Sequence, residues 1–281
     1  MRYQITHHTT YDYSAQVFPE PHYLRFQPQT TAYARLESFD LEVSPAPAGL
    51  RHHRDAEGNL VAYTWFGGSC AQLVIRAESV VATREYNPLG FLLEGSTLRG
   101  PTPNYSDAQR QLLHASLAAP AVGAELHAFG DEVALEVPEG DVVGFLLALA
   151  RAVHGGFEAV YREVGPPLPP DETFRRRSGS CRDLSWMLIA LLRRRGFAAR
   201  FVSGYFYFEL DPPAYELHAW VEVFLPGAGW FGIDPTHGLA TGPSHLPLAA
   251  SARPARTMPV TGGIRGDATS TMTNRLTITP L

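Results

Sequence analysis

The chain of 281 residues lacks the features that mark several common classes of protein. Its two cysteines, Cys70 and Cys181, are too few for a disulfide framework, and we do not expect them to be bridged. The longest apolar run, Val142–Ala150, is about half of the roughly 20 residues that span a bilayer. The N-terminus has no apolar signal core. We therefore expect a soluble, cytoplasmic protein with no membrane partner.

Strong charge and metal-binding motifs are missing as well. Charged residues make up 18% of the chain, hydrophobic residues 45%, and the net charge is −5, so a sizeable core is available and a nucleic-acid partner is not expected. Eleven histidines are present, yet neither His-Glu-x-x-His nor paired Cys-x-x-Cys occurs. The acidic calcium-loop pattern Asp-x-Asp-x-Asn-Gly is also missing. We expect no metal and no cofactor.

The first 85 residues are patterned as short strands separated by turns rich in Pro, Gly, Asn and Asp. A β-sandwich is the natural way to bury such strands, and residues 55–59 are typical of a hairpin turn. Residues 86–105 contain several proline and glycine turn signals and are typical of a linker. The predicted strands are Tyr3–Tyr13, Tyr23–Gln27, Leu36–Val43, Leu60–Phe66 and Leu73–Thr83.

The rest of the chain mixes helical and strand patterns. Apolar spacing and caps predict helices over Ser106–Leu117 and Asp141–His154. A proline-rich loop, Val164–Pro170, is a groove wall, a mobile lid or a rigid connector, and the connector is favoured. Strand patterns follow over Ala198–Phe208 and Ala268–Thr279, and we expect the second to return to one of two sheets.

Cys181 lies at the start of the best-defined helix of the chain. Apolar residues recur at helical spacing from Leu184 to Leu192, and Gly196 stops the pattern after three arginines. Ser178 and Ser180 are candidate N-caps, so the thiol falls on the first turn, where the helix dipole favours a thiolate. Position alone leaves two interpretations open, a nucleophile or a small buried apolar side chain.

Two further residues complete a possible catalytic set. His218 lies in an alternating, aromatic-rich strand, and Asp234 ends the next strand, just before Pro235 stops the ladder. A four-residue loop at 226–229 would point the two side chains to opposite faces. An odd loop or one bulge would instead pair Trp220 with Asp234 and bring the two side chains within reach. We predict the odd loop or bulge, because two glycines make it inexpensive.

The blocks GSCRDLSWMLIALLRRRGFAARFVSGY and LHAWVEVFLPGAGWFGIDPTHG resemble the core of the bacterial transglutaminase-like cysteine protease superfamily. The resemblance covers roughly positions 140 to 250, and the first 90 or so residues resemble the β-rich region that precedes this core. It implies an α+β protein, with an N-terminal β-sandwich-like domain (residues 1–95) followed by a papain-like or transglutaminase-like core (residues 96–281). In that core, a helix carrying the cysteine packs on an antiparallel sheet carrying the histidine and the aspartate.

The resemblance also implies roles for residues. Cys181 is the expected nucleophile, His218 the base and Asp234 the residue that orients the base. The backbone N–H of Cys181 is available as an oxyanion donor, and Tyr161 is our candidate for a second, with Trp220 as a core or cleft-lining residue near the substrate. His237 departs from the family pattern, and we favour an exposed loop histidine over one that assists or competes for Asp234.

The expected activity is hydrolysis of an amide bond in a peptide or protein through a thioester on Cys181. A peptidase or amidase and an amine-accepting transglutaminase share this acyl-enzyme, so both remain possible from the sequence. A non-catalytic peptide-binding module is the third alternative, although such a module has no need of Cys, His and Asp together. No feature of the sequence specifies an oligomeric state.

Overall fold

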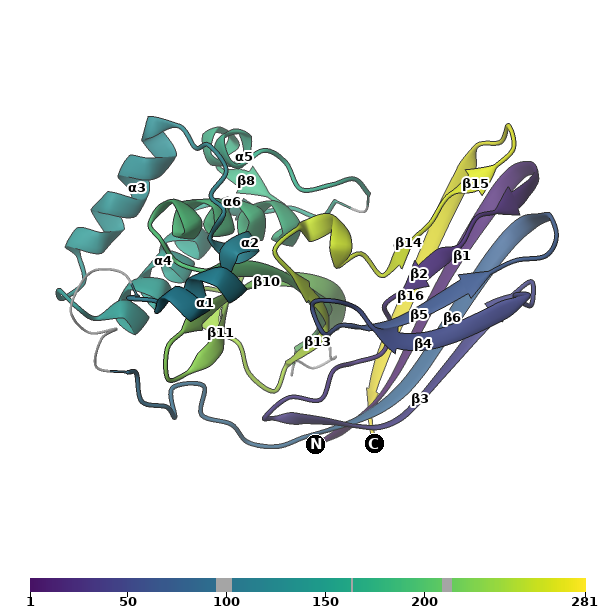
Figure 1. The fold of residues 1–281 in the computed structure, drawn as a ribbon, viewed down its shortest axis with the longest axis horizontal. Helices are drawn as coiled ribbons and strands as arrows, with labels where there is room; N and C mark the ends of the chain where they lie inside the picture. The colour runs from purple at the N-terminus through teal and green to yellow at the C-terminus, as the bar shows by residue number, and fades with distance from the viewer. Residues whose placement is uncertain (95–102, 163, 209–213) are drawn as a thin grey trace.

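The structure is a computed structural model that describes residues 1–94, 103–162, 164–208 and 214–281. In Figure 1 helices gather around one sheet on the left, and long antiparallel strands form a second body on the right. The two ends of the chain lie near one another beside the long strands. The α+β architecture predicted from the sequence is confirmed.

The N-terminal region is a sandwich of two antiparallel sheets, as predicted. One sheet is built on β1, β6 and β3, and the other on β2, β5 and β4. A cluster of buried apolar side chains from β2, β5 and β6 lies between them. The turn at 55–59 connects β4 to β5, and β4 itself was not predicted. The strands are β1 (Arg2–Pro19), β2 (His22–Leu24), β3 (Ala34–Ser44), β4 (Gly49–Arg54), β5 (Leu60–Trp65) and β6 (Cys70–Thr83).

The last part of the chain returns to this sandwich. β16 (Ser270–Pro280) pairs with β1 along its length, from Tyr3 opposite Pro280 to Tyr13 opposite Ser270. The two-residue strands β14 (Val260–Thr261) and β15 (Ile264–Arg265) pair with β2 and β1. The predicted boundary between residues 95 and 96 adjoins residues 95–102, which lie outside the described part of the chain, and it stays a prediction.

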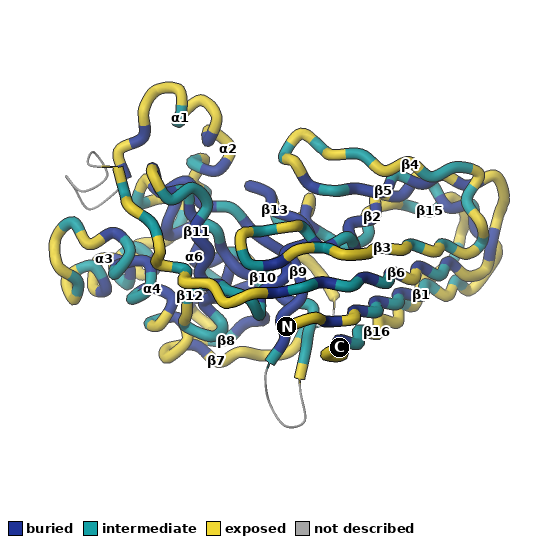
Figure 2. Tube along the Cα trace, turned by 90° about the horizontal axis from the view of Figure 1, so that it is seen from below, coloured by how far each residue is buried: buried dark blue, intermediate teal, exposed yellow. Residues whose placement is uncertain are grey.

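The second body is built on a five-stranded antiparallel sheet in the order β12-β11-β10-β9-β13. Apolar residues of β10 and β11 share one buried cluster with the helices α4 and α6. Figure 2 shows buried residues concentrated where β9, β10, β13 and α6 meet. The strands are β9 (Ala199–Phe208), β10 (Ala214–Leu225), β11 (Gly229–Asp234), β12 (Leu239–Ala240) and β13 (His245–Ser251).

The predicted helices are confirmed, whereas α3 and the seven-residue α5 were not predicted. Leu126, Gly130 and Val133 are the buried residues of α3, a stripe too narrow for apolar periodicity to reveal. The first predicted helix is split at Leu113, with Ser106 as its N-cap. Among the described residues, no helix is both long enough and apolar enough to cross a membrane. The helices are α1 (Asp107–Leu112), α2 (His114–Leu117), α3 (Ala124–Leu135), α4 (Val142–Gly156), α5 (Pro170–Arg176) and α6 (Cys181–Arg194).

The two bodies share a buried junction. Tyr205 and Tyr207 of β9 pack with Tyr3 and Ile5 of β1 and with residues of β13 and β16. Within this junction the His7 ring bonds the Tyr205 hydroxyl at 3.0 Å and Asn274 Oδ1 at 2.7 Å. The sandwich therefore supports the strand β9, which lies beside the candidate site.

Candidate active site

The helix α6 presents Cys181 at its first residue. Ser180 caps the helix in a reciprocal arrangement with Asp183, whose Oδ2 accepts the Ser180 N–H at 2.8 Å. One turn further along, the Ser185 hydroxyl donates to the carbonyl of Ala219 at 3.1 Å, which ties α6 to β10 next to His218. Cys181 is partly exposed, and both it and Cys70 are free thiols. The helix thus holds an accessible thiol beside the strand that carries His218.

The β10–β11 hairpin has the register that the sequence predicted. Leu225 lies opposite Gly229, so the loop holds three residues, 226–228, and Val221 lies opposite Ile233. This register places Trp220 opposite Asp234 and makes His218 the diagonal neighbour of Asp234. Positive φ angles at Gly227 and Gly229 allow the turn. The odd loop is confirmed.

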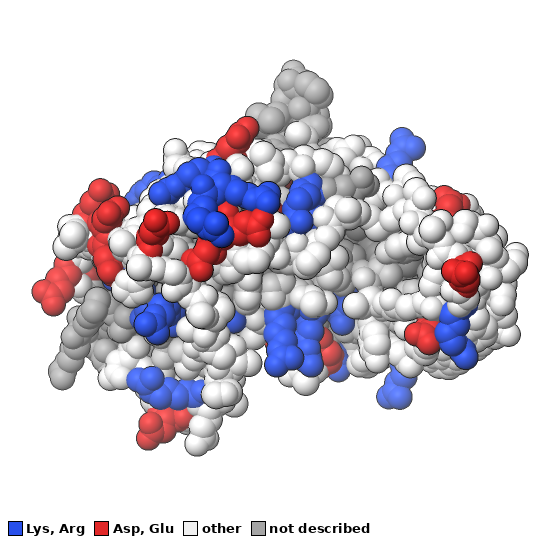
Figure 3. All heavy atoms as spheres, turned by 90° about the horizontal axis from the view of Figure 1, so that it is seen from above, with Lys and Arg blue, Asp and Glu red and all other residues white. Residues whose placement is uncertain are grey.

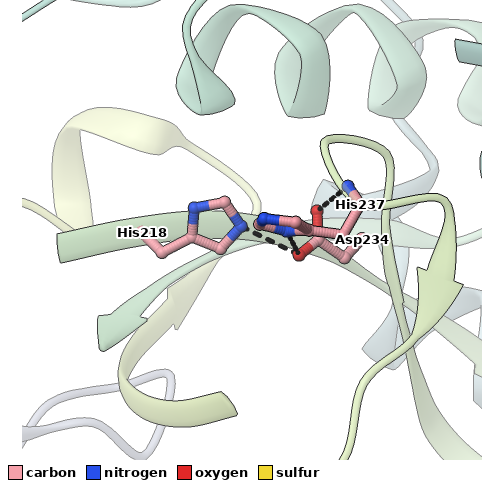
Figure 4. Close-up of side chains that lie close together, drawn as sticks. All are labelled: His218, Asp234 and His237. Atoms are coloured by element: carbon pink, nitrogen blue, oxygen red, sulfur yellow. Dashed lines mark hydrogen bonds and ion pairs between the residues drawn. The ribbon is translucent and has the colours of Figure 1, made fainter. Parts of the chain in front are cut away.

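Asp234 is a fully buried carboxylate surrounded by N–H donors (Figure 4). Its Oδ2 atom lies 2.9 Å from Nε2 of His218, 2.8 Å from Nδ1 of His237 and 3.1 Å from Nε2 of His245. Its Oδ1 atom accepts the backbone N–H groups of Thr236 and His237 at 2.8 and 3.3 Å. The carboxylate is therefore fixed in both position and orientation.

His218 and Asp234 favour each other's charged forms in spite of their burial. Burial opposes protonation of the imidazole, but the hydrogen bond to Asp234 and the charge of that residue hold the pKa of His218 well above its ordinary value. Burial likewise opposes ionisation of Asp234, yet the bonds from His218, His237 and His245 hold the pKa of this carboxyl well below its ordinary value. Asp234 therefore stays ionised and makes His218 a stronger base.

The other ring nitrogen of His218, Nδ1, is the one available to Cys181. Nε2 is occupied by Asp234, whereas Nδ1 is buried and has no directional hydrogen bond within the described part of the chain. The neighbouring Cys181 and Glu216 side chains both favour the protonated ring and so raise the pKa of His218. Glu216 Oε1 lies 2.8 Å from Nδ1, and its side chain is 42% exposed. Glu216 was not singled out from the sequence, because no motif marks it.

The proline-rich loop is attached to the helix α6. Oδ1 of Asp183 accepts the Leu168 N–H at 2.7 Å and a guanidinium N–H of Arg162 at 2.6 Å. Asp183 is itself completely buried, so one carboxylate joins the loop to the N-cap of α6. These contacts support the predicted rigid connector over a mobile lid.

Charged side chains around the helix α5 occur in pairs of opposite sign. Figure 3 shows basic and acidic side chains side by side over the region of α5. Arg176 pairs with Glu172, and Arg195 pairs with Asp131. The guanidinium of Arg177 lies instead 4.1 Å from the ring centroid of Phe174.

The structure places the remaining predicted residues as follows. Tyr161 follows the short strand β7 (Glu158–Ala159), which pairs with β8 (Ser178–Gly179) just before Cys181. Tyr161 is 87% exposed, and its role as an oxyanion donor stays a prediction. Trp220 is 1% exposed and packs edge-on against His245 with ring centroids 5.2 Å apart, a position that does not favour substrate contact.

His237 and His245 are the two histidines whose place was not foreseen. The favoured interpretation of His237 as an exposed loop residue was wrong, because its ring bonds Asp234 and stacks on Phe206 at 4.5 Å. His245 comes from β13, a strand distant in sequence, so no spacing relates it to His218 or Asp234. The atoms of His218, Asp234 and His237 lie within 4.8 Å of one another, a spacing that a metal ion accepts. Each of these atoms is already engaged in the hydrogen-bonded set around Asp234.

Two family models match the chain. Residues 3–82 match the bacterial transglutaminase-like N-terminal region, and residues 133–235 match the transglutaminase-like superfamily. The second match contains Cys181, His218 and Asp234. The first match spans the six N-terminal strands of the sandwich, and the second spans the helices α4 to α6 and the strands β9 to β11.

Similar proteins agree with these matches. An uncharacterized protein of Mycobacterium tuberculosis is 28% identical over 270 residues, covering 84% of this chain and 79% of that protein. A protein-glutamine gamma-glutamyltransferase of Pseudomonas aeruginosa is 38% identical over 77 residues, covering 25% of this chain but only 12% of that protein. A crystal structure from Cytophaga hutchinsonii, described as a candidate cysteine protease, shares the fold with a TM-score of 0.71 and 19% identity, covering 100% and 91% of the two chains. The chain belongs to the transglutaminase-like superfamily, with a bacterial transglutaminase-like N-terminal region before its core.

Proposed function

We propose that the protein is a cysteine hydrolase that cleaves an amide bond in a peptide or protein, with Cys181, His218 and Asp234 as its catalytic triad. The observation that carries the proposal is that the two ring nitrogens of His218 have different partners. Nε2 is held by the ionised Asp234, and the partly exposed Cys181 interacts with the same ring and raises the pKa of His218, which leaves Nδ1 for the thiol. A nucleophile, a base and a group that orients the base are thus in sequence around one imidazole.

The chemistry follows from this order. His218 Nδ1 takes the proton of the Cys181 thiol, and the sulfur forms a bond to the amide carbonyl carbon. The oxyanion accepts the backbone N–H of Cys181, with Tyr161 as a candidate second donor. The C–N bond then breaks, and the proton on Nδ1 passes to the leaving amine. Water attacks the thioester with His218 as base, the C–S bond breaks, and the proton returns to the sulfur.

Resolution of the thioester by an amine is the second candidate activity. The similarity to a protein-glutamine gamma-glutamyltransferase over 77 residues favours keeping it. All 23 basic residues counted as Lys or Arg are arginines, so the chain offers no lysine amine as an acceptor. In an assay the acyl group would therefore pass to water, to an added amine or to the chain's own amino terminus.

A peptide panel with and without an added primary amine tests the proposal. Product masses distinguish acids, which hydrolysis produces, from amides, which transfer produces. Cys181→Ala is expected to lose all activity, and full activity in that variant would overturn the triad. Predominant amide formation at low amine concentration would assign the second activity instead.

Thiol labelling provides an independent test, because Cys70 is an internal control. Cys70 is 8% exposed, and burial raises the pKa of its thiol, so it should label slowly. We expect iodoacetamide at pH 6 to modify Cys181 first, with the site identified by mass spectrometry. If Cys181 labels no faster than a free thiol, the proposal that its thiol is activated would be contradicted. Rapid labelling without turnover of any peptide would favour a binding module.

A further inference from the structure

The proposed triad leaves a third buried imidazole unused. His245 begins β13, is 1% exposed, and places its Nε2 atom 3.1 Å from Oδ2 of Asp234. This oxygen is the one that binds His218. His245 therefore contacts the carboxylate from a strand that contributes nothing else to the triad.

The tautomer of His245 is set by its other nitrogen. The backbone N–H of Gly242 donates to Nδ1 at 3.3 Å, so Nδ1 is an acceptor and the ring proton resides on Nε2. Burial lowers the pKa of His245 in spite of the adjacent carboxylate, so the ring is neutral near pH 7. His245 is thus a permanent single donor to Asp234.

The ring of His245 has little freedom to turn. It packs edge-on against Phe206 with ring centroids 4.5 Å apart, and edge-on against Trp220. His245 also lies directly opposite Phe206 in the β13–β9 register, so the backbone is held as well as the ring. A donor fixed in this way constrains the plane of the carboxylate it binds.

We propose that His245 is a positioning residue that fixes Asp234 and limits how strongly this carboxylate attracts the proton of His218. The inference rests on the proposed triad. The charged and titratable groups that face Asp234 are His218 from β10, His237 after β11 and His245 from β13, with Cys181 and Glu216 one contact further, at His218. A carboxylate oxygen that accepts an additional N–H hydrogen bond is a weaker acceptor for each of its other N–H donors. Loss of the His245 donor should therefore raise the pKa of His218.

Three variants test this role. His245→Phe removes the donor, His245→Gln places an amide N–H near the position of Nε2, and Ser251→Ala is the matched control. Ser251 is a buried residue of the same strand that bonds Glu57 at 2.9 Å and does not touch Asp234. We expect the Phe variant to lose about ten-fold or more in kcat with little change in KM, since a hydrogen bond to a charged group is removed. The Gln variant should recover most of this loss, and Ser251→Ala should keep its kcat.

The titration of the His218 ring, followed by NMR in a Cys181→Ala background, gives a second measurement that does not need activity. We expect the pKa of His218 to shift upward in His245→Phe, and to shift upward by less in His245→Gln. An unchanged kcat and an unchanged titration would overturn the inference. Should the Phe variant fail to fold, His245→Asn, whose shorter amide does not reach Asp234, takes its place beside His245→Gln. Activity retained by Cys181→Ala would instead refute the triad, and the titration would still report on His245.

Discussion

Gly204 of β9 lies directly opposite His218 of β10. Because Gly204 has no side chain, the indole of Trp220 fits beside it. A β-carbon at residue 204 would lie 2.6 Å from the end of that indole and 2.3 Å from the carbonyl oxygen of Leu246. Both contacts are shorter than atoms tolerate. Close packing at this point is what allows β13 to approach β9 and bring His245 to Asp234.

We predict that Gly204→Ala separates β13 from β9 and weakens the site. Overpacking of this kind costs about 1–3 kcal/mol, so the free energy of unfolding in urea should fall by about that amount. Activity at a temperature where the variant is folded should fall too, because His245 moves with β13. Gly155→Ala in α4, where nothing lies within 4 Å, is the control and should leave both measurements unchanged or raise stability slightly. Wild-type behaviour of Gly204→Ala would contradict this account of the packing.

Asp234→Asn should disable the base without removing the thiol. The amide carries no charge, so the pKa of His218 should fall toward or below its ordinary value, and kcat/KM should drop by roughly 10³–10⁴-fold. Peptide kinetics and the NMR titration of His218 measure the two effects. Glu222→Gln, also on β10, loses an ion pair to Arg200 at 2.7 Å and should retain its activity. A loss of less than ten-fold in Asp234→Asn would argue against Asp234 as the orienting residue.

Asp183→Asn should destabilise the protein more than the removal of a surface charge. Its carboxylate joins Ser180, Leu168 and Arg162, and the removal of one partner from a buried ion pair typically costs about 3–5 kcal/mol. Burial opposes ionisation of Asp183, but its N–H and hydroxyl donors lower its pKa. The stability it contributes is therefore present above the ordinary carboxyl pKa and is lost as the pH falls through the lower folded value.

Urea unfolding at pH 7 and at pH 3 checks both statements about Asp183. The free energy of unfolding of the wild type should fall from pH 7 to pH 3, and that of Asp183→Asn should fall by less. Asp107→Asn on the exposed first turn of α1 is the matched control and should resemble the wild type. An Asn variant as stable as the wild type at pH 7 would show that the carboxylate does not anchor the loop.

His7 should make the junction between the two bodies sensitive to acid. Burial lowers the pKa of His7 to about 4 from an ordinary 6.5. The folded protein therefore binds this proton less readily than the unfolded chain, so stability is full above pH 6.5 and declines as the pH falls toward 4. The difference between these two pKa values of His7 corresponds to about 3 kcal/mol of free energy of unfolding.

The comparison of His7→Gln with the exposed His52→Gln isolates this contribution. The free energy of unfolding should depend less on pH between 7 and 4.5 in His7→Gln than in the wild type, whereas His52→Gln should keep the wild-type slope. Equal slopes in all three proteins would show that His7 does not titrate as its burial requires.

The hairpin shows what local sequence could predict. Gly227 and Gly229 limited the turn to a few geometries, and only an odd loop allowed His218 and Asp234 to meet, so the register followed from two glycines and a chemical requirement. The position of Cys181 followed from helical spacing and a cap. Such features depend on residues within one or two elements, where periodicity and turn chemistry act.

His245 and Glu216 could not be predicted in the same way. His245 reaches Asp234 only because β13 pairs with β9, and this pairing joins segments some 40 residues apart for which the sequence has no spacing rule. Glu216 is an ordinary polar residue of β10 until the position of the His218 ring is known. The helix α3 was missed for a different reason, because a glycine interrupts its buried stripe.

The pairing of β16 with β1 determines when the chain can finish folding. Eleven consecutive pairs join residues near the two ends of the sequence, and the Leu281 N–H bonds the carbonyl of Arg2 at 2.9 Å. During synthesis, one edge of β1 has no partner until residues 270–280 have left the ribosome. An unpaired edge of this length can pair with other chains. A nascent chain stalled before residue 270 is therefore expected to be more prone to aggregation than the released protein.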